Sequence, residues 1–202
     1  MRQSPSVLIL IRHGQSTWNK EDRFTGLVDV PLSPQGVEEC KCAARMIRRY
    51  RLHIAFTSML KRAYESLSII LNELSVHLIT VHAAALNERC YGVLQGLNKN
   101  IVQKRYGKEQ MELWRRSFKV RPPGGESLAD TYDRVVPFFT SHVLPELRQN
   151  RNVLVVAHGN SLRALCAHLE NIKENDIPQL EIGYALPIIY ILEQSGVFKK
   201  QI

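Results

Sequence analysis

The chain has no apolar run long enough to cross a membrane, and its first residues lack the small-residue cleavage site of a signal peptide. Its four cysteines lack the spacing of a zinc site, because Cys40 and Cys42 fall in one predicted helix, where residues two apart do not share a face. We therefore expect a cytoplasmic protein with reduced thiols and no membrane partner. The length of 202 residues suits a single domain over residues 1–202.

Two motifs of metal-dependent phosphate chemistry are also missing. No segment has the pattern G-x-x-x-x-G-K-[ST] of a nucleotide-binding loop, and no pair of aspartates suggests a magnesium site. We therefore expect no metal ion in the site. Any phosphate chemistry must then depend on cationic side chains and a side-chain nucleophile.

The net charge of +8 indicates an anionic partner. Nucleic-acid-binding proteins typically carry a dense basic run with interleaved aromatic residues. The densest cluster here, residues 45–51, lies at the end of a predicted helix, where cations complement the helix dipole. A solvated helix end is the favoured interpretation, and we expect no nucleic-acid partner. The non-enzyme alternative is a basic module that binds anions or nucleic acid without catalysis.

The sequence does contain two apolar runs, rich in β-branched residues, that each end in His-Gly. Residues 7–11 lead into Arg12 and His13, and residues 152–157 lead into His158. Continuous apolar runs are typical of strands buried on both faces of a parallel sheet. Ligands bind at the carboxyl edge of such sheets, so neighbouring strands would place both imidazoles at one crevice.

Strands and helices alternate along the rest of the chain. Ser33, followed by Pro34, opens one helix, and Ser127 opens another. We predict strands at residues 7–11, 53–57, 76–81, 152–157 and 187–192. We predict helices at 34–50, at 59–74, at 127–148 with a kink at Pro137, and from 161, and a pair of helices over 101–118. This order predicts an α/β fold: a three-layer sandwich whose mainly parallel central sheet has helices on both faces.

Groups suited to phosphate gather beside the predicted strand ends and in the loops. Arginine binds phosphate bidentately, lysine binds it as a point charge, and the backbone of Gly159 and Asn160 at a helix start offers further donors. These groups predict phosphoryl transfer, with neutral His13 as the nucleophile and its pKa lowered by nearby cations. Glu88 is the candidate for proton exchange with the substrate, and an ordinary surface-loop glutamate is an equally weighted interpretation.

Several longer blocks are more specific than single residues. They include L-I-R-H-G-Q-S-T-W-N at 10–19, R-F-T-G at 23–26, T-S-x-L-K-R-A at 57–63, L-N-E-R-C-Y-G at 86–92, L-Q-G-L-N-K at 94–99, W-R-R-S at 114–117 and A-H-G-N-S-L-R-A-L at 157–165. On these blocks nearly the whole chain resembles the cofactor-dependent phosphoglycerate mutases of the histidine phosphatase superfamily. R-H-G alone is typical of the superfamily, which consists mostly of phosphatases, whereas the blocks at 86–92, 94–99 and 114–117 are much more specific to the mutases.

The resemblance implies that His13 is the phosphohistidine nucleophile and Glu88 the proton donor and acceptor. It implies that His158, Arg12 and Arg62 stabilise the transferring phosphoryl group. The groups implied to hold phosphate and carboxylate are Ser16, Asn19, Thr25, Gly26, Arg89, Tyr91, Lys99, Arg115, Arg116, Gly159 and Asn160.

The activity implied by the resemblance is the interconversion of 3-phosphoglycerate and 2-phosphoglycerate in glycolysis and gluconeogenesis. The priming phosphate donor would be 2,3-bisphosphoglycerate, and the expected partner is a small-molecule phosphoglycerate. The assembly would be a homodimer or a homotetramer. The enzyme alternatives are a phosphatase of the same superfamily, in which water accepts the phosphoryl group, and a bisphosphoglycerate mutase.

The chain departs from the family pattern in four places. Cys90 stands where a histidine is common, and the segment between Ser117 and Ser127 is shorter than in many members. The residues 184–187, Tyr-Ala-Leu-Pro, replace a Thr-Gly that usually precedes a dipeptide ending in proline. The tail after the last predicted strand is short.

Overall fold

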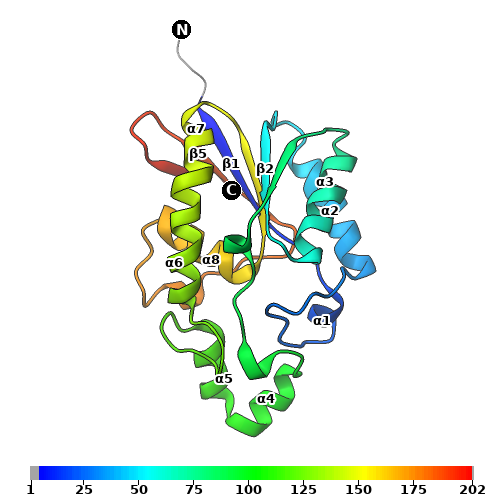
Figure 1. The fold of residues 1–202 in the computed structure, drawn as a ribbon, viewed down its shortest axis with the longest axis vertical. Helices are drawn as coiled ribbons and strands as arrows, with labels where there is room; N and C mark the ends of the chain where they lie inside the picture. The colour runs from blue at the N-terminus through cyan, green and yellow to red at the C-terminus, as the bar shows by residue number, and fades with distance from the viewer. Residues whose placement is uncertain (1–4, 202) are drawn as a thin grey trace.

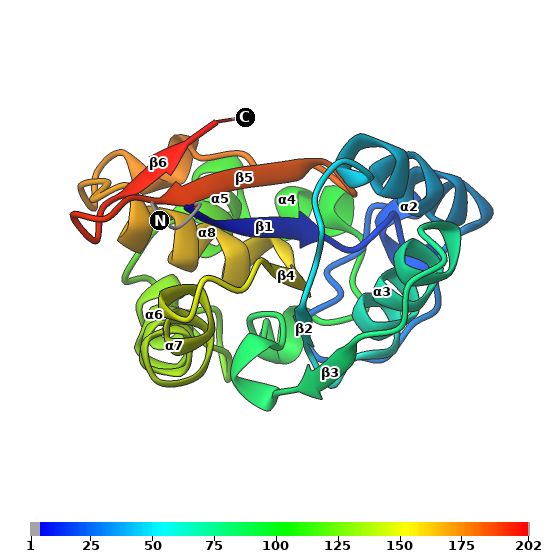
Figure 2. The same cartoon turned by 90° about the horizontal axis from the view of Figure 1, so that it is seen from above.

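The computed structural model describes residues 5–201, and its centre is a six-stranded sheet in the order β3-β2-β4-β1-β5-β6 (Figure 2). The strands are β1 Ser6–Arg12, β2 Ile54–Thr57, β3 Ile79–His82, β4 Val153–Ala157, β5 Pro187–Leu192 and β6 Phe198–Lys200. The first four run parallel, and β5 and β6 add an antiparallel edge. The prediction of a mainly parallel sheet is confirmed. Residues 1–4 and 202, the ends of the predicted domain, lie outside the described residues.

The two His-Gly strands are central because both of their faces are apolar. Successive side chains of a strand point to opposite faces of the sheet. In β1, Leu8 and Leu10 therefore pack into one core cluster, and Ile9 and Ile11 pack into the other. The same alternation holds along β4, which pairs with β1 in parallel register. This pairing brings the carboxyl ends of the two strands together, as the sequence predicted.

Helices cover both faces of the sheet, which confirms the three-layer sandwich (Figure 1). One face packs against α2 Pro34–Ile47 and α3 Lys61–Glu73. The other face packs against α6 Leu128–Phe138, α7 Leu144–Arg148 and α8 Gly159–Leu169. Among residues 5–201, no helix is long and apolar enough to cross a membrane.

The predicted helix over residues 127–148 is interrupted. A π-helical segment, Phe139–Val143, separates α6 from α7. Proline lacks the N–H that an α-helix needs at each interior position, and both Pro137 and Pro145 lie beside this segment. The hydroxyl of Ser141 donates to the carbonyl of Pro137 at 2.7 Å, which helps to accommodate the irregular turn.

A smaller layer lies beyond the carboxyl ends of the parallel strands (Figure 1). Its helices are α1 Thr17–Lys20, α4 Lys99–Tyr106 and α5 Lys108–Arg116, with a short 3₁₀ turn at Gly92–Leu94. Two further 3₁₀ turns pack against the helices beside the sheet, Ala84–Leu86 near α6 and Ile177–Gln179 near α8. Phe24, Leu94 and Trp114 form part of its own apolar cluster. This cluster fixes the loops that carry polar residues over the edge of the sheet.

Candidate active site

His13 lies directly after β1, and its backbone N–H donates to the carbonyl of Ala157 at the end of β4 at 2.9 Å. The turn that follows is tight, because a Cβ on Gly14 would come within 2.2 Å of the carbonyl oxygen of Gly36 at the start of α2. The N–H of Gly14 also donates to Ser66 Oγ on α3 at 3.1 Å. Contacts from β4, α2 and α3 therefore fix the backbone of His13 and Gly14, and with it the position of the imidazole.

The hydrogen bonds of His13 define its tautomer. Its Nδ1 lies 2.6 Å from the carbonyl oxygen of Gly14, and because a carbonyl only accepts, Nδ1 carries the hydrogen. The lone pair is then on Nε2, which accepts from Arg62 Nε at 3.3 Å. Burial lowers the pKa of His13 well below its usual value, and the charges of Arg62 and Arg12 lower it further. The sequence argument named only the cations, but burial is the larger cause.

His158 lies at the end of β4, and its ring centroid is 4.9 Å from that of His13. The predicted meeting of the two imidazoles at one crevice is confirmed. His158 Nε2 contacts Ser58 Oγ at 2.7 Å, while Nδ1 is buried and has no hydrogen-bond partner among residues 5–201. Burial, followed by the charge of Arg62, lowers the pKa of His158 well below its usual value.

Two arginines flank His13. Arg62, buried in the first turn of α3, donates to the carbonyls of Val28 at 3.0 Å and Gly26 at 2.7 Å, so it ties the loop after α1 to the nucleophile. Burial lowers the pKa of Arg62 to about 10, which leaves it protonated at neutral pH. Arg12 donates through Nη1 to the carbonyl of Ile182 at 2.9 Å.

Glu88 is buried in the loop after β3, where its Oε1 accepts the backbone N–H groups of Arg89 at 2.9 Å and Asn160 at 3.1 Å. The second contact joins Glu88 to the first turn of α8. Backbone donors at a helix start suit an anion, and here they face a carboxylate. The alternative of a solvated surface glutamate is therefore wrong.

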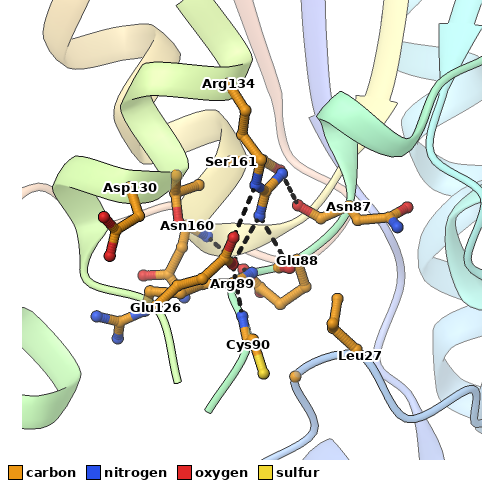
Figure 3. Close-up of polar contacts among 12 residues, drawn as sticks. Leu27, Asn87, Glu88, Arg89, Cys90, Glu126, Asp130, Arg134, Asn160 and Ser161 are labelled. Atoms are coloured by element: carbon orange, nitrogen blue, oxygen red, sulfur yellow. Dashed lines mark hydrogen bonds and ion pairs between the residues drawn. The ribbon is translucent and has the colours of Figure 1, made fainter. Parts of the chain in front are cut away.

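The loop that carries Glu88 is held by an arginine–glutamate pair, which we call the 126/134 clamp (Figure 3). Arg134 on α6 donates to the carbonyls of Asn87 at 2.9 Å and Glu88 at 3.1 Å. It also pairs with Glu126 at 3.1 Å, and Glu126 accepts the N–H of Cys90 at 2.8 Å. The clamp therefore fixes the backbone on both sides of Glu88.

His13, its two flanking arginines and Glu88 line a cavity of about 290 Å³. All of the predicted site residues line it except Ser16, Arg89 and His158. Those that line it are Arg12, His13, Asn19, Thr25, Gly26, Arg62, Glu88, Tyr91, Lys99, Arg115, Arg116, Gly159 and Asn160. The fold therefore brings residues that lie far apart in the sequence together around this one cavity.

The three other predicted residues lie behind the cavity wall. Ser16 is buried and caps α1, where its hydroxyl accepts the N–H of Asn19 at 3.2 Å. Arg89 is buried and donates to the carbonyls of Trp114 at 2.9 Å and Arg115 at 3.0 Å. Both therefore hold a cavity residue in place without facing the cavity, and His158 is buried next to His13.

Five residues that line the cavity were not among the site residues implied by the resemblance: Arg23, Phe24, Arg163, Glu181 and Tyr184. Of these, Arg23 lies in a loop whose polar residues suit an oxyanion. Arg163 was detectable, because it is a lone charge among the apolar residues of α8. It donates through Nη1 to Asn160 Oδ1 at 2.7 Å. Tyr184 has its ring centroid 3.8 Å from the Arg12 guanidinium carbon. Cys90 lies outside the cavity lining.

The cavity is strongly cationic, because six arginines and one lysine line it against two glutamates. Several buried donors have no partner among residues 5–201, including Arg12 Nε, Thr25 Oγ1 and Arg116 Nη1. A buried donor without a partner carries a free-energy cost that a ligand oxygen would remove. The arrangement therefore suits a small ligand with more than one anionic group beside an unprotonated imidazole. In the described part of the chain, no three His, Cys, Asp or Glu side chains are grouped as they would be around a metal ion.

Residues 8–198 match the histidine phosphatase superfamily (branch 1). A 2,3-bisphosphoglycerate-dependent phosphoglycerate mutase of Cytophaga hutchinsonii is 50% identical over 184 residues, which cover 91% of this chain and 86% of that protein. A phosphoglycerate mutase of Schizosaccharomyces pombe is 44% identical, and the match covers 96% of this chain and 94% of that protein.

Solved structures show the same architecture. A mycobacterial glucosyl-3-phosphoglycerate phosphatase in complex with VO3 has a TM-score of 0.86 at 25% identity, and the match covers 98% of each chain. The Bacillus stearothermophilus protein YhfR has a TM-score of 0.84 at 23% identity, over 98% of this chain and 96% of that one. With its sequence relatives and its fold in agreement, the chain belongs to the histidine phosphatase superfamily and, within it, to the 2,3-bisphosphoglycerate-dependent phosphoglycerate mutases.

Proposed function

We propose that the protein interconverts 3-phosphoglycerate and 2-phosphoglycerate through a phosphohistidine at His13. The observation that carries the proposal is the buried, neutral His13, whose Nε2 lone pair is directed at Arg62 in the wall of a cationic cavity. When bound, 2,3-bisphosphoglycerate supplies the phosphoryl group that primes the histidine. The unpartnered donors of Arg12, Thr25 and Arg116 fit such a multiply anionic ligand.

In the proposed reaction, His13 Nε2 attacks phosphorus, and the bond between phosphorus and the substrate oxygen breaks. Glu88 gives a proton to the leaving oxygen, and in the reverse step it takes the proton of the accepting hydroxyl. Arg12, Arg62 and His158 stabilise the charge on the phosphoryl group as it moves. Their positions are fixed before the ligand arrives, so little reorganisation accompanies the transfer.

The remaining cavity residues are proposed to bind the ligand. Asn19, Thr25, Gly26, Gly159 and Asn160 would hold the reacting phosphate beside His13. The groups proposed to hold the second phosphate and the carboxylate are Tyr91, Lys99, Arg115 and Arg116. Ser16 and Arg89 are assigned to positioning, because they contact Asn19 and the end of α5 from behind.

The sequence relatives favour this proposal over the phosphatase alternative. Proteins named as mutases are 40–50% identical to the chain, whereas the solved phosphatase structures are 20–25% identical. The proposal also includes a cytoplasmic location. The four cysteines, all of which are free, support this location, because disulfides are rare in the cytoplasm.

We expect mutase activity to depend on 2,3-bisphosphoglycerate and to be unaffected by a chelator. The reason is that cationic side chains already line the cavity and can supply the charge that a metal ion would provide. The measurement is conversion of 3-phosphoglycerate with and without added 2,3-bisphosphoglycerate, each in the presence and absence of EDTA. Activity lost on chelation and restored by magnesium or manganese would contradict the mechanism. Release of inorganic phosphate in place of 2-phosphoglycerate would support the phosphatase alternative.

Removing both arginines at the end of α5, in Arg115→Ala with Arg116→Ala, should raise KM for 3-phosphoglycerate at least about 100-fold. Each charge-assisted hydrogen bond is worth roughly 1.5–3 kcal/mol, and about 1.4 kcal/mol changes affinity tenfold. Hydrolysis of a small phosphate ester without a carboxylate should be nearly unchanged. Arg45→Ala is the matched control, because Arg45 pairs with Glu73 away from the cavity. Equal losses on both substrates would show that the two arginines serve the fold or the chemistry.

A further inference from the structure

Glu181 is a cavity residue whose charge the proposed reaction does not use. The cavity is lined by two carboxylates, and Glu88 already has the role of proton exchange. A second negative charge in a site for a multiply anionic ligand opposes binding by simple Coulomb repulsion. Its presence therefore needs an explanation within the site.

The backbone around Glu181 is held by arginines that also line the cavity. Arg163 Nε donates to the carbonyl of Leu180 at 2.9 Å, and Arg12 Nη1 donates to the carbonyl of Ile182 at 2.9 Å. The Glu181 side chain itself is 73% exposed. Its backbone is therefore fixed, while its carboxylate has room to rotate away from the cavity.

The Glu181 carboxylate lies 2.6 Å from Arg116 Nη2. Arg116 is only 22% exposed, and its Nη1 is buried without a partner in the described part of the chain. The planar guanidinium can bind a carboxylate through two nitrogens, and Glu181 uses one of them. Because Nη1 is buried, a carboxylate that reaches Arg116 from the cavity competes with Glu181 for Nη2.

Two other cations of the cavity also pair with acidic residues, but, unlike Glu181, those acidic residues lie outside the cavity lining. Arg115 pairs with Glu112 at 2.6 Å, and Lys99 pairs with Asp22 at 2.6 Å. Neither Glu112 nor Asp22 lines the cavity, so a ligand can reach these cations without displacing the acid. At Arg116, in contrast, the partner acid Glu181 itself lines the cavity.

We propose that Glu181 is a specificity-determining residue whose carboxylate occupies, in the free protein, the place on Arg116 that the substrate carboxylate takes. The inference rests on the proposed function, since it assumes a phosphoglycerate ligand. Binding of a ligand with a carboxylate displaces Glu181 into solvent. A phosphate ester without a carboxylate leaves the Glu181–Arg116 pair intact. Glu181 thereby reduces the affinity for carboxylate-bearing ligands, and it keeps Arg116 oriented between turnovers.

The test is calorimetric titration of the protein with 3-phosphoglycerate and, separately, with glycerol 3-phosphate, which lacks the carboxylate. Glu181→Gln should bind 3-phosphoglycerate about two- to five-fold more tightly than wild type, the range expected for losing one partly exposed ion pair. Its affinity for glycerol 3-phosphate should not change. Glu174→Gln, which removes an acid that pairs with Lys119 outside the cavity, should leave both affinities unchanged.

Four outcomes would overturn the proposal. Unchanged 3-phosphoglycerate affinity in Glu181→Gln would mean that the two carboxylates do not compete. Weaker binding would mean that Glu181 only positions Arg116, and equal tightening of both ligands would indicate a general charge effect. In an Arg116→Ala background, the Glu181→Gln change should have no effect, and any remaining tightening would also contradict the proposal.

These measurements separate the inference from the proposed function, because binding is measured without turnover. If wild type fails to interconvert the phosphoglycerates and Glu181→Gln still tightens 3-phosphoglycerate selectively, only the proposed function is wrong. If wild type catalyses the reaction and Glu181→Gln has no selective effect, only the role of Glu181 is wrong.

Discussion

His13→Ala should not become phosphorylated when it is incubated with 2,3-bisphosphoglycerate, whereas wild type should give an acid-labile, alkali-stable phosphoprotein. His13 Nε2 is the neutral, buried nitrogen whose lone pair is held toward Arg62, and alanine leaves no nucleophile at that place. Mutase turnover should fall to the background level together with the label. The measurement is incorporation of labelled phosphate after rapid mixing, followed by acid and alkali treatment of the denatured protein.

Two variants control this experiment. His142→Ala removes an exposed histidine of the π-helical segment after α6, outside the cavity lining, and should be labelled like wild type. His158→Ala should still be labelled, but more slowly, because His158 stabilises the transfer and does not receive the phosphoryl group. If His13→Ala were labelled to the wild-type stoichiometry, another residue would be the nucleophile.

Glu88→Gln should lower mutase turnover by roughly 10²–10⁴, the usual contribution of positioned proton transfer, with little change in substrate affinity. Gln retains an oxygen that can accept from the N–H groups of Arg89 and Asn160, so the loop geometry should be kept. The amide cannot exchange the proton of the substrate hydroxyl. Turnover and KM are measured by steady-state kinetics, with Glu174→Gln as the matched control.

A second readout isolates the proton step. Phosphorylation of His13 by a donor with an acidic leaving group needs no proton, so Glu88→Gln should affect it far less than it affects turnover. A general folding defect would lower both rates together. Near wild-type turnover in Glu88→Gln would assign proton transfer to a water molecule or to His158.

The parts of the fold that could be predicted are those that depend on local pattern. The apolar runs of β1 and β4 gave buried central strands, and Ser33 and Ser127 do cap their helices. The strand β6 was missed because it is only three residues long and only its first residue is apolar, so periodicity has nothing to detect.

In the site, too, the residues that could be predicted are those that belong to a local sequence pattern. His13, His158 and Glu88 follow from strand ends and motifs, which are local features of the sequence. Glu181 and Tyr184 reach the cavity because their segment is joined to the end of β1, where the N–H of Ala185 donates to the carbonyl of Arg12 at 2.9 Å. That contact spans most of the chain, and no spacing rule in a single sequence reveals it.

The 126/134 clamp has a consequence for how the length of the segment between Ser117 and Ser127 can vary. The segment between Ser117 and Ser127 is closed at its base by the N–H of Ala129, which donates to the carbonyl of Phe118 at 2.8 Å. Its far end is fixed by Glu126, whose N–H donates to the carbonyl of Cys90 at 2.8 Å.

Residues inserted between Phe118 and Pro122 would therefore extend outward without moving the loop that carries the proton-exchanging carboxyl. The length of this segment can therefore change during evolution, or be altered in the laboratory, while the loop that carries Glu88 keeps its contacts with the 126/134 clamp. A graft that breaks the contact between Glu126 and Cys90 would remove this independence.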